Sequence, residues 1–432
     1  MGRWLYTGLL HLIMPFAVMR LFVRSRKNPA YKQRIRERFG CFPKTALSGQ
    51  AVIWIHSVSL GETLASELMV REMMSMYPHH RFLITTMTPT GSDCVKKLYG
   101  NTVDHYYLPY DLPLALKRFF HRFSPKLAVI VETELWPNML HQCRSFHVPV
   151  ILVNARLSER SAKGYKKISR LTREMLDNVT MVACQHQADS ERFQSLGLAE
   201  GKCCVTGSIK FDLTVGDAVI EAGKQLRGRW ESGLEHPARI WIAASTHEGE
   251  DEVILSVFQS LKERFTDLLL VLVPRHPERF DSVFHLCLKK GLSVVRHSQG
   301  SVASPETQVI LGDTMGEMLT FYGASDIAFV GGSLVATGGH NILEPAVLGL
   351  PVLTGPHVFN FQAISQSLQQ AGGMLQVDNQ QKLEDALSQM LSDTQQFSAM
   401  GKKARAFVHA NQGALQKLLQ LVQKTLQEDK AS

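Results

Sequence analysis

The sequence predicts an α/β protein with two doubly wound, Rossmann-like domains that face a cleft. Three observations support this fold class. The chain has 432 residues, more than one hydrophobic core usually accommodates. Short apolar runs alternate with helix-length segments, as is typical of strands buried on both faces of a parallel sheet. The alternation lapses once, between Phe211 and His236, and then resumes.

The N-terminal segment precedes both series and has a different character. Trp4 to Met19 contains no Asp, Glu, Lys or Arg, although it is slightly shorter than the roughly 20 apolar residues that span a bilayer. A basic block follows it instead of a small-residue cleavage site, which favours a retained anchor over a removed signal peptide. We expect residues 1–23 to anchor the chain, either across the membrane or in its plane. A buried N-terminal helix is the alternative.

Most of the net charge of +8 arises in one cluster. Between Arg20 and Arg38, Glu37 is the single acid among eight basic residues. Such a cluster beside an apolar segment attracts anionic lipid headgroups and keeps the following chain on the cytoplasmic side. The seven cysteines form no CxxC pair, which indicates reduced thiols and argues against a zinc site.

The two series give the expected domain boundaries, residues 24–212 and residues 237–400. The first series contains "AVIWIHS" from Ala51, "RFLITTMT" from Arg81, "LAVIVETE" from Leu127, "PVILVNAR" from Pro149, "TMVACQ" from Thr180 and "KCCVTGS" from Lys202. The second contains "RIWIAAST" from Arg239, "LLLVLVPRH" from Leu268, "QVILGDT" from Gln308, "DIAFVGGS" from Asp326 and "PVLTGP" from Pro351. We expect a linker at residues 213–236. Helical spacing from Leu383 to Leu426 predicts a C-terminal helix and tail at residues 401–432.

Neither series opens with the glycine-rich pattern of dinucleotide-binding proteins. Gly-x-Gly-x-x-Gly is absent between each first strand and its helix, and no Walker A motif occurs. A dehydrogenase is therefore disfavoured.

Glu62 follows the first strand at the point where a helix should begin, and two explanations compete. Ser59-Leu60-Gly61-Glu62 fits the Ser-x-x-Glu capping box, in which the Glu side chain reaches back to a free backbone N–H. Alternatively, a carboxylate at the C-terminal end of a parallel strand lies where open α/β sheets bind substrate. These residues alone favour the cap. Polar groups at other strand ends shift the balance, because a catalytic base needs such partners and a cap does not.

Several other strand ends carry such groups. Glu132 follows an apolar run directly, and Lys210 lies at the hinge after the first series, where it is either solvated or directed into the cleft. In the second domain, Pro274 and Arg275 follow a strand. A guanidinium there suits an anionic ligand, because it donates two hydrogen bonds at once.

The most specific turn spans Gly331 to Pro356. Its glycines lead into a helix predicted to start near Asn341, whose free N–H groups would seat a nucleotide phosphate. Glu344, one turn further on, could accept hydrogen bonds from ribose hydroxyls. In the turn before it, Gly316 lets the backbone approach a ligand closely, and Glu317 would open a helix.

Seven segments together resemble one family, the bacterial Kdo transferases of lipopolysaccharide assembly. They are "HSVSLGE", "TTMTPTGS", "ETELWPN", "VNARLSERS", "TGSIKFD", "PRHPERF" and "GGHNILEPA", in the family's order. The resemblance covers essentially the whole chain. Members of this family move 3-deoxy-D-manno-oct-2-ulosonic acid (Kdo) from its CMP donor to a lipid A precursor. The resemblance implies the two-Rossmann glycosyltransferase B fold.

The resemblance also implies residue roles. Glu62 corresponds to the general base that deprotonates the acceptor hydroxyl, and Glu132 and Lys210 to groups that stabilise the transition state. The CMP contacts fall on Pro274, Arg275, Met315, Gly316, Glu317, Asn341, Ile342, Leu343 and Glu344. Direct attack by a hydroxyl inverts the anomeric centre and needs one base. No DxD-type metal motif is evident, so we expect neither a metal nor a cofactor.

The implied partners are the CMP-Kdo donor, a lipid A precursor (lipid IVA) as acceptor and the cytoplasmic face of the inner membrane, held by the N-terminal anchor. No nucleic-acid partner is expected. One alternative is another membrane-associated transferase of envelope synthesis that uses a UDP or ADP donor. A second is a non-catalytic module that binds nucleotide or lipid.

Overall fold

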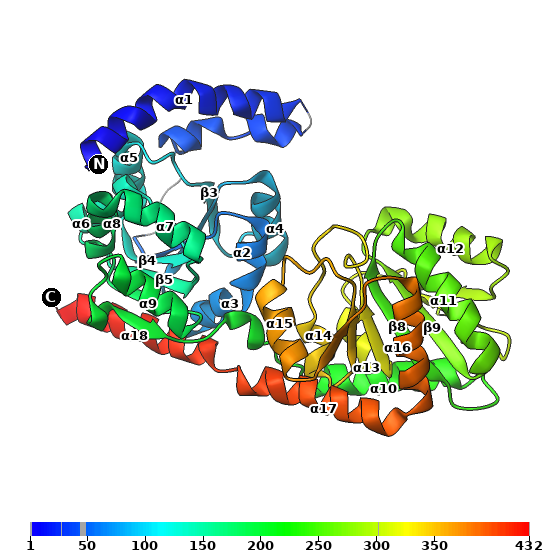
Figure 1. Cartoon of the computed structure of the whole chain (residues 1–432). Coiled ribbons are helices and arrows are strands. Elements are labelled where there is room, and N and C mark those ends of the chain that lie inside the picture. Colours follow the sequence, from blue (N-terminus) through cyan, green and yellow to red (C-terminus); the bar gives the residue numbers. More distant parts are fainter. Residues whose placement is uncertain (1, 27, 44–48, 301, 432) are drawn as a thin grey trace. The chain divides into compact units, whose positions relative to one another are not determined.

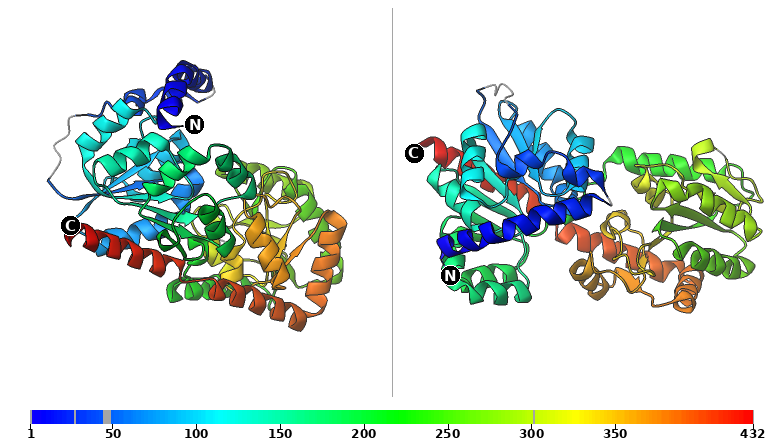
Figure 2. Two further views of the ribbon diagram at one scale, coloured as in Figure 1. Left: turned by 60° about the vertical axis from the view of Figure 1, so that its left-hand side comes forward. Right: turned by 90° about the horizontal axis from the view of Figure 1, so that it is seen from above.

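The computed structural model describes residues 2–26, 28–43, 49–300 and 302–431, and the chain divides into two compact units (Figure 1). The first unit comprises residues 1–212 and 412–432, and the second comprises residues 213–411. Each unit contains one parallel sheet with helices on both faces, as Figure 2 shows from two further directions. The predicted α/β class with two Rossmann-like units is therefore confirmed.

The first unit has a seven-stranded sheet in the order β3-β2-β1-β4-β5-β6-β7. Its strands are β1 (Val52–His56), β2 (Arg81–Thr86), β3 (Asp104–Tyr107), β4 (Pro125–Val131), β5 (Val150–Ala155), β6 (Met181–Cys184) and β7 (Cys203–Val205). Its helices after β1 are α2 (Leu60–Ala65), α3 (Glu67–Met76), α4 (Pro89–Tyr99), α5 (Pro113–Phe123), α6 (Pro137–Ser145), α7 (Glu159–Lys167), α8 (Ser169–Asp177), α9 (Gln187–Ser195), the 3-10 helices η3 (Glu200–Lys202) and η4 (Ile209–Phe211), and α18 (Ala414–Ala431). Successive β1 side chains point to opposite faces, so Trp54 packs in one core and Ile53 in the other.

The second unit has a seven-stranded sheet in the order β10-β11-β9-β8-β12-β13-β14. Its strands are β8 (Arg239–Thr246), β9 (Leu268–Pro274), β10 (Val294–Arg296), β11 (Val309–Leu311), β12 (Ile327–Val330), β13 (Val352–Thr354) and β14 (Met374–Gln376). Its helices are α10 (Asp217–Glu231), α11 (Glu250–Arg264), η5 (Pro277–Arg279), α12 (Phe280–Lys289), η6 (His297–Gln299), α13 (Met318–Gly323), α14 (Leu343–Val347), α15 (Gln362–Gln370), α16 (Gln380–Ser392) and α17 (Thr394–Ala410). Trp241 and Ile242 of β8 likewise belong to opposite cores.

All the apolar runs predicted as strands form strands, and the strands that were not predicted lie at sheet edges. β3, β10 and β14 each pair with a single neighbour. An edge strand is covered less completely than a central one, so its residues need not form a continuous apolar run. "DHYY" in β3 is an example, with its first three residues only partly buried.

The expected linker at residues 213–236 instead contains α10, which belongs to the second unit. Leu226 and Trp230 of α10 are buried in that unit's core. Gly223 lies so close to α13 that an added Cβ would stand 2.8 Å from the carbonyl carbon of Gly323. Charged residues on the exposed face of α10 conceal this packing in the sequence.

The expected C-terminal helix and tail also divides differently. α17 stays in the second unit, whereas α18 returns to the first, where Leu418 and Val422 fill the core beside β1. Helical spacing identifies an amphipathic helix but does not reveal which sheet it covers.

The N-terminal apolar segment forms α1 (Arg3–Ser25), followed by η1 (Pro29–Lys32) and η2 (Ile35–Phe39). Within the described residues, α1 is the one helix long and apolar enough to cross a membrane. It lies along the surface of the first unit (Figures 1 and 2). The Arg3 guanidinium and the Thr7 hydroxyl each donate a hydrogen bond to the Asn138 side-chain oxygen at 3.1 Å. α1 is therefore held by α6.

The basic cluster after α1 is only partly available to solvent. Arg38 is 2% exposed, and its guanidinium lies 4.2 Å from the ring centroid of Tyr107. Arg34 pairs with Glu37 at 2.7 Å. These two cations therefore stabilise the fold.

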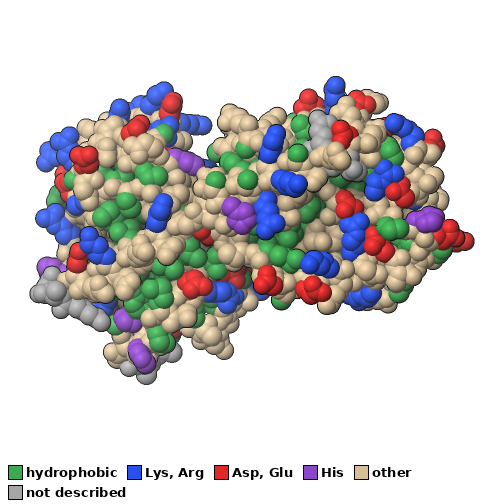
Figure 3. Space-filling view, turned by 90° about the horizontal axis from the view of Figure 1, so that it is seen from below, with side chains coloured by type: hydrophobic (Ala, Val, Ile, Leu, Met, Phe, Trp, Pro, Cys, Tyr) green, Lys and Arg blue, Asp and Glu red, His purple; other side chains and the backbone are tan. Residues whose placement is uncertain are grey.

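On the face shown in Figure 3, basic and acidic side chains are interspersed with hydrophobic ones.

Candidate active site

Two residues at the carboxyl edge of the first sheet have left-handed backbone conformations. Glu132, directly after β4, has a φ of 61°, and Asn154 in β5 has a φ of 54°. The pairing of β5 with β6 changes register between Leu152 and Ala155. Non-glycine residues rarely adopt this conformation, and such strain and bulges gather at active sites. This edge is therefore the first candidate site.

Glu62 lies in the first turn of α2, and its side chain is folded as the capping explanation requires. One carboxylate oxygen accepts the Val58 N–H at 2.7 Å, and the other accepts the Ser59 hydroxyl at 2.7 Å. The Ser59 oxygen accepts the Glu62 N–H at 3.4 Å. The cap is thus present, with Val58, the residue before the N-cap, as the backbone donor.

The same carboxyl group is less acidic than an ordinary glutamate. Burial raises the pKa of Glu62 to about 7, although its hydrogen bonds to Ser59 and Val58 lower it. The nearby charges of Glu132 and Glu134 raise it further. A carboxylate has about four lone-pair sites, and the cap occupies two of them. Capping therefore leaves Glu62 able to accept a proton near neutral pH.

Lys210 lies on η4, after the edge strand β7. Burial lowers the pKa of the Lys210 ammonium, while the Glu132 carboxylate raises it and Arg156 lowers it. Glu132 thus influences both Glu62 and Lys210. The first unit brings together the three residues predicted to be catalytic.

Glu134 belongs to the same group, although no role was predicted for it from the sequence. The Trp136 indole N–H donates to its carboxylate at 2.7 Å, while burial raises the Glu134 pKa. His56, at the end of β1, packs against Trp136 with ring centroids 5.7 Å apart. The sequence clue to His56 was its position at the end of a strand, directly before "SVSLGE".

In the second unit, the end of β8 is bulged and strained. Ser245 has a φ of 57°, and the pairing with β9 shifts register between Ala244 and Thr246. A bulge at a strand end redirects the side chains that follow it. Here it precedes His247, which becomes part of the candidate site of this unit.

Glu250 is fully buried at the start of α11, and its carboxylate accepts four backbone N–H groups. The donors are His247 at 2.9 Å, Gly332 at 2.7 Å, Ser333 at 2.9 Å and Leu334 at 2.9 Å. The turn after β12 is therefore an anion-binding nest already filled by the protein's own carboxylate. The sequence did not point to Glu250, because three of its four donors lie more than 80 residues away.

The predicted nucleotide contacts on the β9 and β12 sides lie near one another. The Asn341 amide donates to the Glu344 carboxylate at 3.0 Å, and its oxygen accepts the Leu343 N–H at 3.1 Å. Burial raises the pKa of Glu344, and Arg275 lowers it. Arg275 has an exposed side chain, and its N–H donates to the Thr246 carbonyl at 3.0 Å. This grouping presents a cation, a carboxylate and an amide.

The remaining predicted contacts differ in exposure. Pro274, Ile342 and Leu343 are buried, so a nucleotide would meet mainly their backbone. Met315 is 54% exposed, Gly316 has a φ of 90°, and Glu317 directly precedes α13. α13 contacts α14. The predicted contacts before α13 and those at the start of α14 therefore lie on neighbouring helices.

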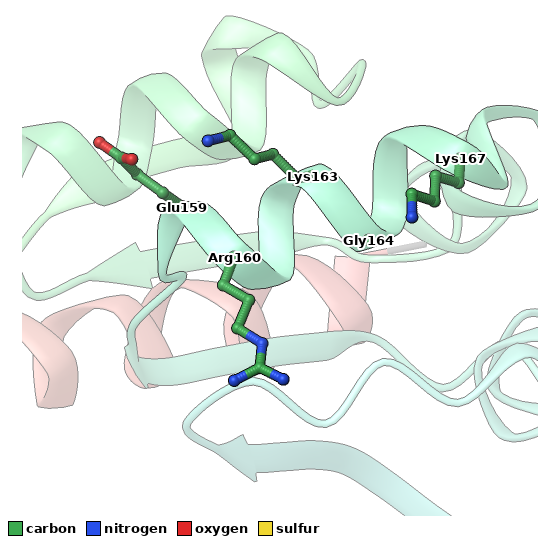
Figure 4. A pocket seen from close by; sticks show the side chains of 5 residues that line it. All are labelled: Glu159, Arg160, Lys163, Gly164 and Lys167. Carbon is green, nitrogen blue, oxygen red and sulfur yellow. The ribbon is translucent and has the colours of Figure 1, made fainter.

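A groove along α7 lies outside these groups. It has a volume of about 650 Å³ and is lined by Glu159, Arg160, Lys163, Gly164 and Lys167 (Figure 4). All five residues come from one helix and are exposed, so the groove is a charged helix surface. Among the described residues, no group of three or more His, Cys, Asp or Glu side chains could hold a metal ion.

The chain has two Rossmann-like units. The first has acidic residues at its strand ends, and the second has turns suited to a nucleotide. This combination is typical of nucleotide-sugar glycosyltransferases. The family model for 3-deoxy-D-manno-octulosonic-acid transferase (kdotransferase) matches residues 33–213. The 3-deoxy-D-manno-octulosonic acid transferase of Haemophilus influenzae is 42% identical over 99% of this chain and all of its own length. That of Bordetella pertussis is 33% identical over 99% of this chain and all of its own length.

The chain therefore belongs to the Kdo transferase family and is a glycosyltransferase, as the sequence motifs predicted. The crystal structure of UDP-GlcNAc 2-epimerase from Neisseria meningitidis, bound to UDP-GlcNAc, covers 87% of this chain and 100% of its own. Its TM-score is 0.56 at 13% identity, which supports the fold alone.

Proposed function

We propose that the protein transfers Kdo from CMP-Kdo to lipid IVA, the lipid A precursor, in lipopolysaccharide synthesis by one inverting displacement with Glu62 as the base. The observation that carries this proposal is the partly buried Glu62 carboxyl group near the charges of Glu132 and Glu134, with a pKa of about 7. The acceptor hydroxyl oxygen bonds to the anomeric carbon while its proton moves to Glu62. The bond from that carbon to the CMP phosphate oxygen breaks, and its electron pair leaves with CMP.

Glu132 and Lys210 stabilise the charges that develop in this step. Positive charge grows on the sugar as CMP departs, and negative charge grows on the phosphate. A carboxylate and an ammonium group whose charges influence each other suit these two changes. The nucleotide is held in the second unit by Arg275, Asn341 and Glu344, with the backbone of Pro274, Ile342 and Leu343 and the turn of Met315, Gly316 and Glu317.

The test is Glu62→Gln with Ser59→Ala as the matched control. Gln keeps an oxygen that can accept the Val58 N–H but cannot take the proton, so kcat should fall by about 10²–10⁴ while CMP binding remains. Ser59→Ala removes the capping hydroxyl and should retain transfer. Unchanged transfer by Glu62→Gln would assign this carboxylate to capping alone.

A panel of CMP, UDP and ADP tests the donor. We expect binding of CMP in preference to the others, and a preference for UDP or ADP would point to a different envelope transferase. Nucleotide binding without transfer to any Kdo acceptor would instead indicate a non-catalytic module. Mass analysis of the product formed with lipid IVA identifies the acceptor.

We propose that this activity takes place at the cytoplasmic face of the inner membrane, and the exposed apolar side of α1 supports this. Leu12 and Phe16 of α1 are 72% and 66% exposed, whereas Met14 is 9% exposed and faces the protein. Polar contacts to α6 near one end of α1 and packing against η1 near the other attach it to the first unit. An in-plane helix satisfies both sets of contacts, with Arg20 and Arg24 exposed to anionic headgroups.

A further inference from the structure

His247 and His340 form a side-by-side pair in the second unit to which neither the sequence motifs nor the comparisons assign a role. Their Nε2 atoms are 2.8 Å apart, and their ring planes differ by 8°. The His276 ring packs edge-on against His247, with centroids 5.3 Å apart. Within the described parts of the chain, the contact between the two Nε2 atoms is the one hydrogen bond that either imidazole ring makes.

The pair is held in place from several directions. The strained bulge at Ser245 precedes His247, and the Glu250 carboxylate accepts the His247 N–H. Gly332 lies beneath His340, where an added Cβ would stand 3.0 Å from the His340 Nε2 atom. Both rings are partly exposed, so this arrangement does not serve core packing.

The short contact limits the charge that the pair can carry. A hydrogen bond between two imidazole nitrogens needs one N–H donor and one unprotonated acceptor, so both rings cannot be imidazolium while it lasts. Burial, with smaller contributions from Arg275, His247 and His276, lowers the pKa of His340 to about 4. Burial also lowers the pKa of His247, as do His276, Arg279 and Arg275, while Glu250 raises it. The pair is therefore neutral at pH 7, and the positive charges of Arg275 and Arg279 act on it.

We propose that His247 and His340 bind an anionic oxygen of the donor, on its phosphate or its carboxylate, and that the pair takes up a proton from solvent when it does so. This inference rests on the proposed function, since CMP-Kdo carries both anions. A bound anion offsets the repulsion from the guanidinium groups of Arg275 and Arg279. Two charge-assisted N–H donors can then replace the single contact between the rings.

The test compares His247→Gln and His340→Gln with wild-type protein, using the full chain and CMP-Kdo generated in situ. His285→Gln on α12, which is exposed, is the control. We expect the donor KM to rise at least tenfold in the first two variants and to stay unchanged in the control. Inhibition by CMP, which has the phosphate but not the Kdo carboxylate, distinguishes the two anions. If the inhibition constant of CMP rises by the same factor as the donor KM, the pair binds the phosphate. If the inhibition constant is unchanged, the pair binds the carboxylate.

The pH dependence of the donor KM separates this role from a structural one. In wild-type protein, KM should rise with pH between 6 and 8, by at most about tenfold per pH unit for one proton. Both variants should lack this slope while keeping their folded circular dichroism spectrum. A wild-type KM independent of pH, or unchanged KM values in both variants, overturns the proposal and leaves Kdo transfer standing. Absence of transfer by wild-type protein overturns both.

Discussion

The carboxylate of Asp212 accepts the backbone N–H of Gly413 at 2.6 Å, although 201 positions separate the two residues. Its second oxygen accepts the Leu415 N–H at 2.8 Å. Asp212 follows η4, which carries Lys210, and α18 begins at Ala414. One side chain therefore fixes the start of the C-terminal helix beside a proposed catalytic segment.

Asp212→Ala should destabilise the protein by about 1–3 kcal/mol, because it leaves two N–H groups at a helix start without their acceptor. Chemical denaturation followed by circular dichroism measures this loss. Asp212→Asn retains one side-chain oxygen and should lose less. Asp217→Ala, at the exposed start of α10, is the control. Equal stability of Asp212→Ala and this control would contradict the structural role.

Because of Glu62, we expect the transfer rate to increase with pH in the range around pH 7. The base acts in its ionised form, so with a pKa of about 7 the value of kcat/KM for the acceptor, measured at saturating CMP-Kdo, should rise as pH increases through 7 and then level off. Measured rates from pH 5.5 to 8.5 test this, and the residual activity of Glu62→Gln should lack that increase. Persistence of the same increase in Glu62→Gln would assign the titration to another group.

The same pKa shift predicts an effect on stability. Because folding raises the pKa of Glu62 from its ordinary value of 4.5 to about 7, the folded state favours the neutral carboxyl group. The contribution of this group is complete below pH 4.5 and is lost as pH rises through 7. The Tm of Glu62→Gln relative to wild type should therefore increase between pH 5 and pH 8. A constant difference would count against the raised pKa.

Glu250→Ala should be among the most damaging single substitutions in the second unit. It removes the acceptor of four buried N–H groups, each of which costs about 1–3 kcal/mol when left unpaired, although water entering the space would recover part of this. We expect a large fall in Tm, measured by calorimetry. Glu252→Ala, exposed on the same helix, should leave Tm unchanged.

The exposed face of α1 should control membrane binding. Leu12→Lys with Phe16→Lys should reduce binding to anionic lipid vesicles by at least about tenfold, since each buried side chain contributes about 1.5–3 kcal/mol. Vesicle sedimentation measures this, and Tm should be unchanged. Leu288→Lys, at an exposed apolar position on α12, should bind vesicles like wild type. Unimpaired binding by the double variant would exclude α1 as the membrane contact.

The sequence predicted the central strands well, because residues buried on both faces form continuous apolar runs such as "LLLVLV". The edge strand β3 could not be found this way, since it is only partly buried. The boundaries of the two units could not be predicted from the sequence either. α10 and α18 have the spacing of ordinary amphipathic helices, and the sheet that each covers depends on contacts distant in sequence.

For the site, the strand-end rule located Glu62, Glu132 and Lys210, which the structure groups in one unit, and the family motifs gave their proposed roles. The rule did not separate capping from catalysis at Glu62, because the capped carboxylate also has a raised pKa. His340 stood inside a quoted motif without a role. Its partner His247 lies 93 positions away, directly after a strand whose bulge no local pattern reveals.

The return of α18 has a consequence for synthesis on the ribosome. The ribosome releases α1 and the strands of the first unit long before α18, so this unit lacks part of its hydrophobic core until α18 emerges. The other domain is encoded without interruption and can close earlier. A nonsense mutation between the codons for α17 and α18 would therefore leave the second unit complete. It would remove part of the core of the first unit, which carries Glu62, although most of that unit is encoded far upstream.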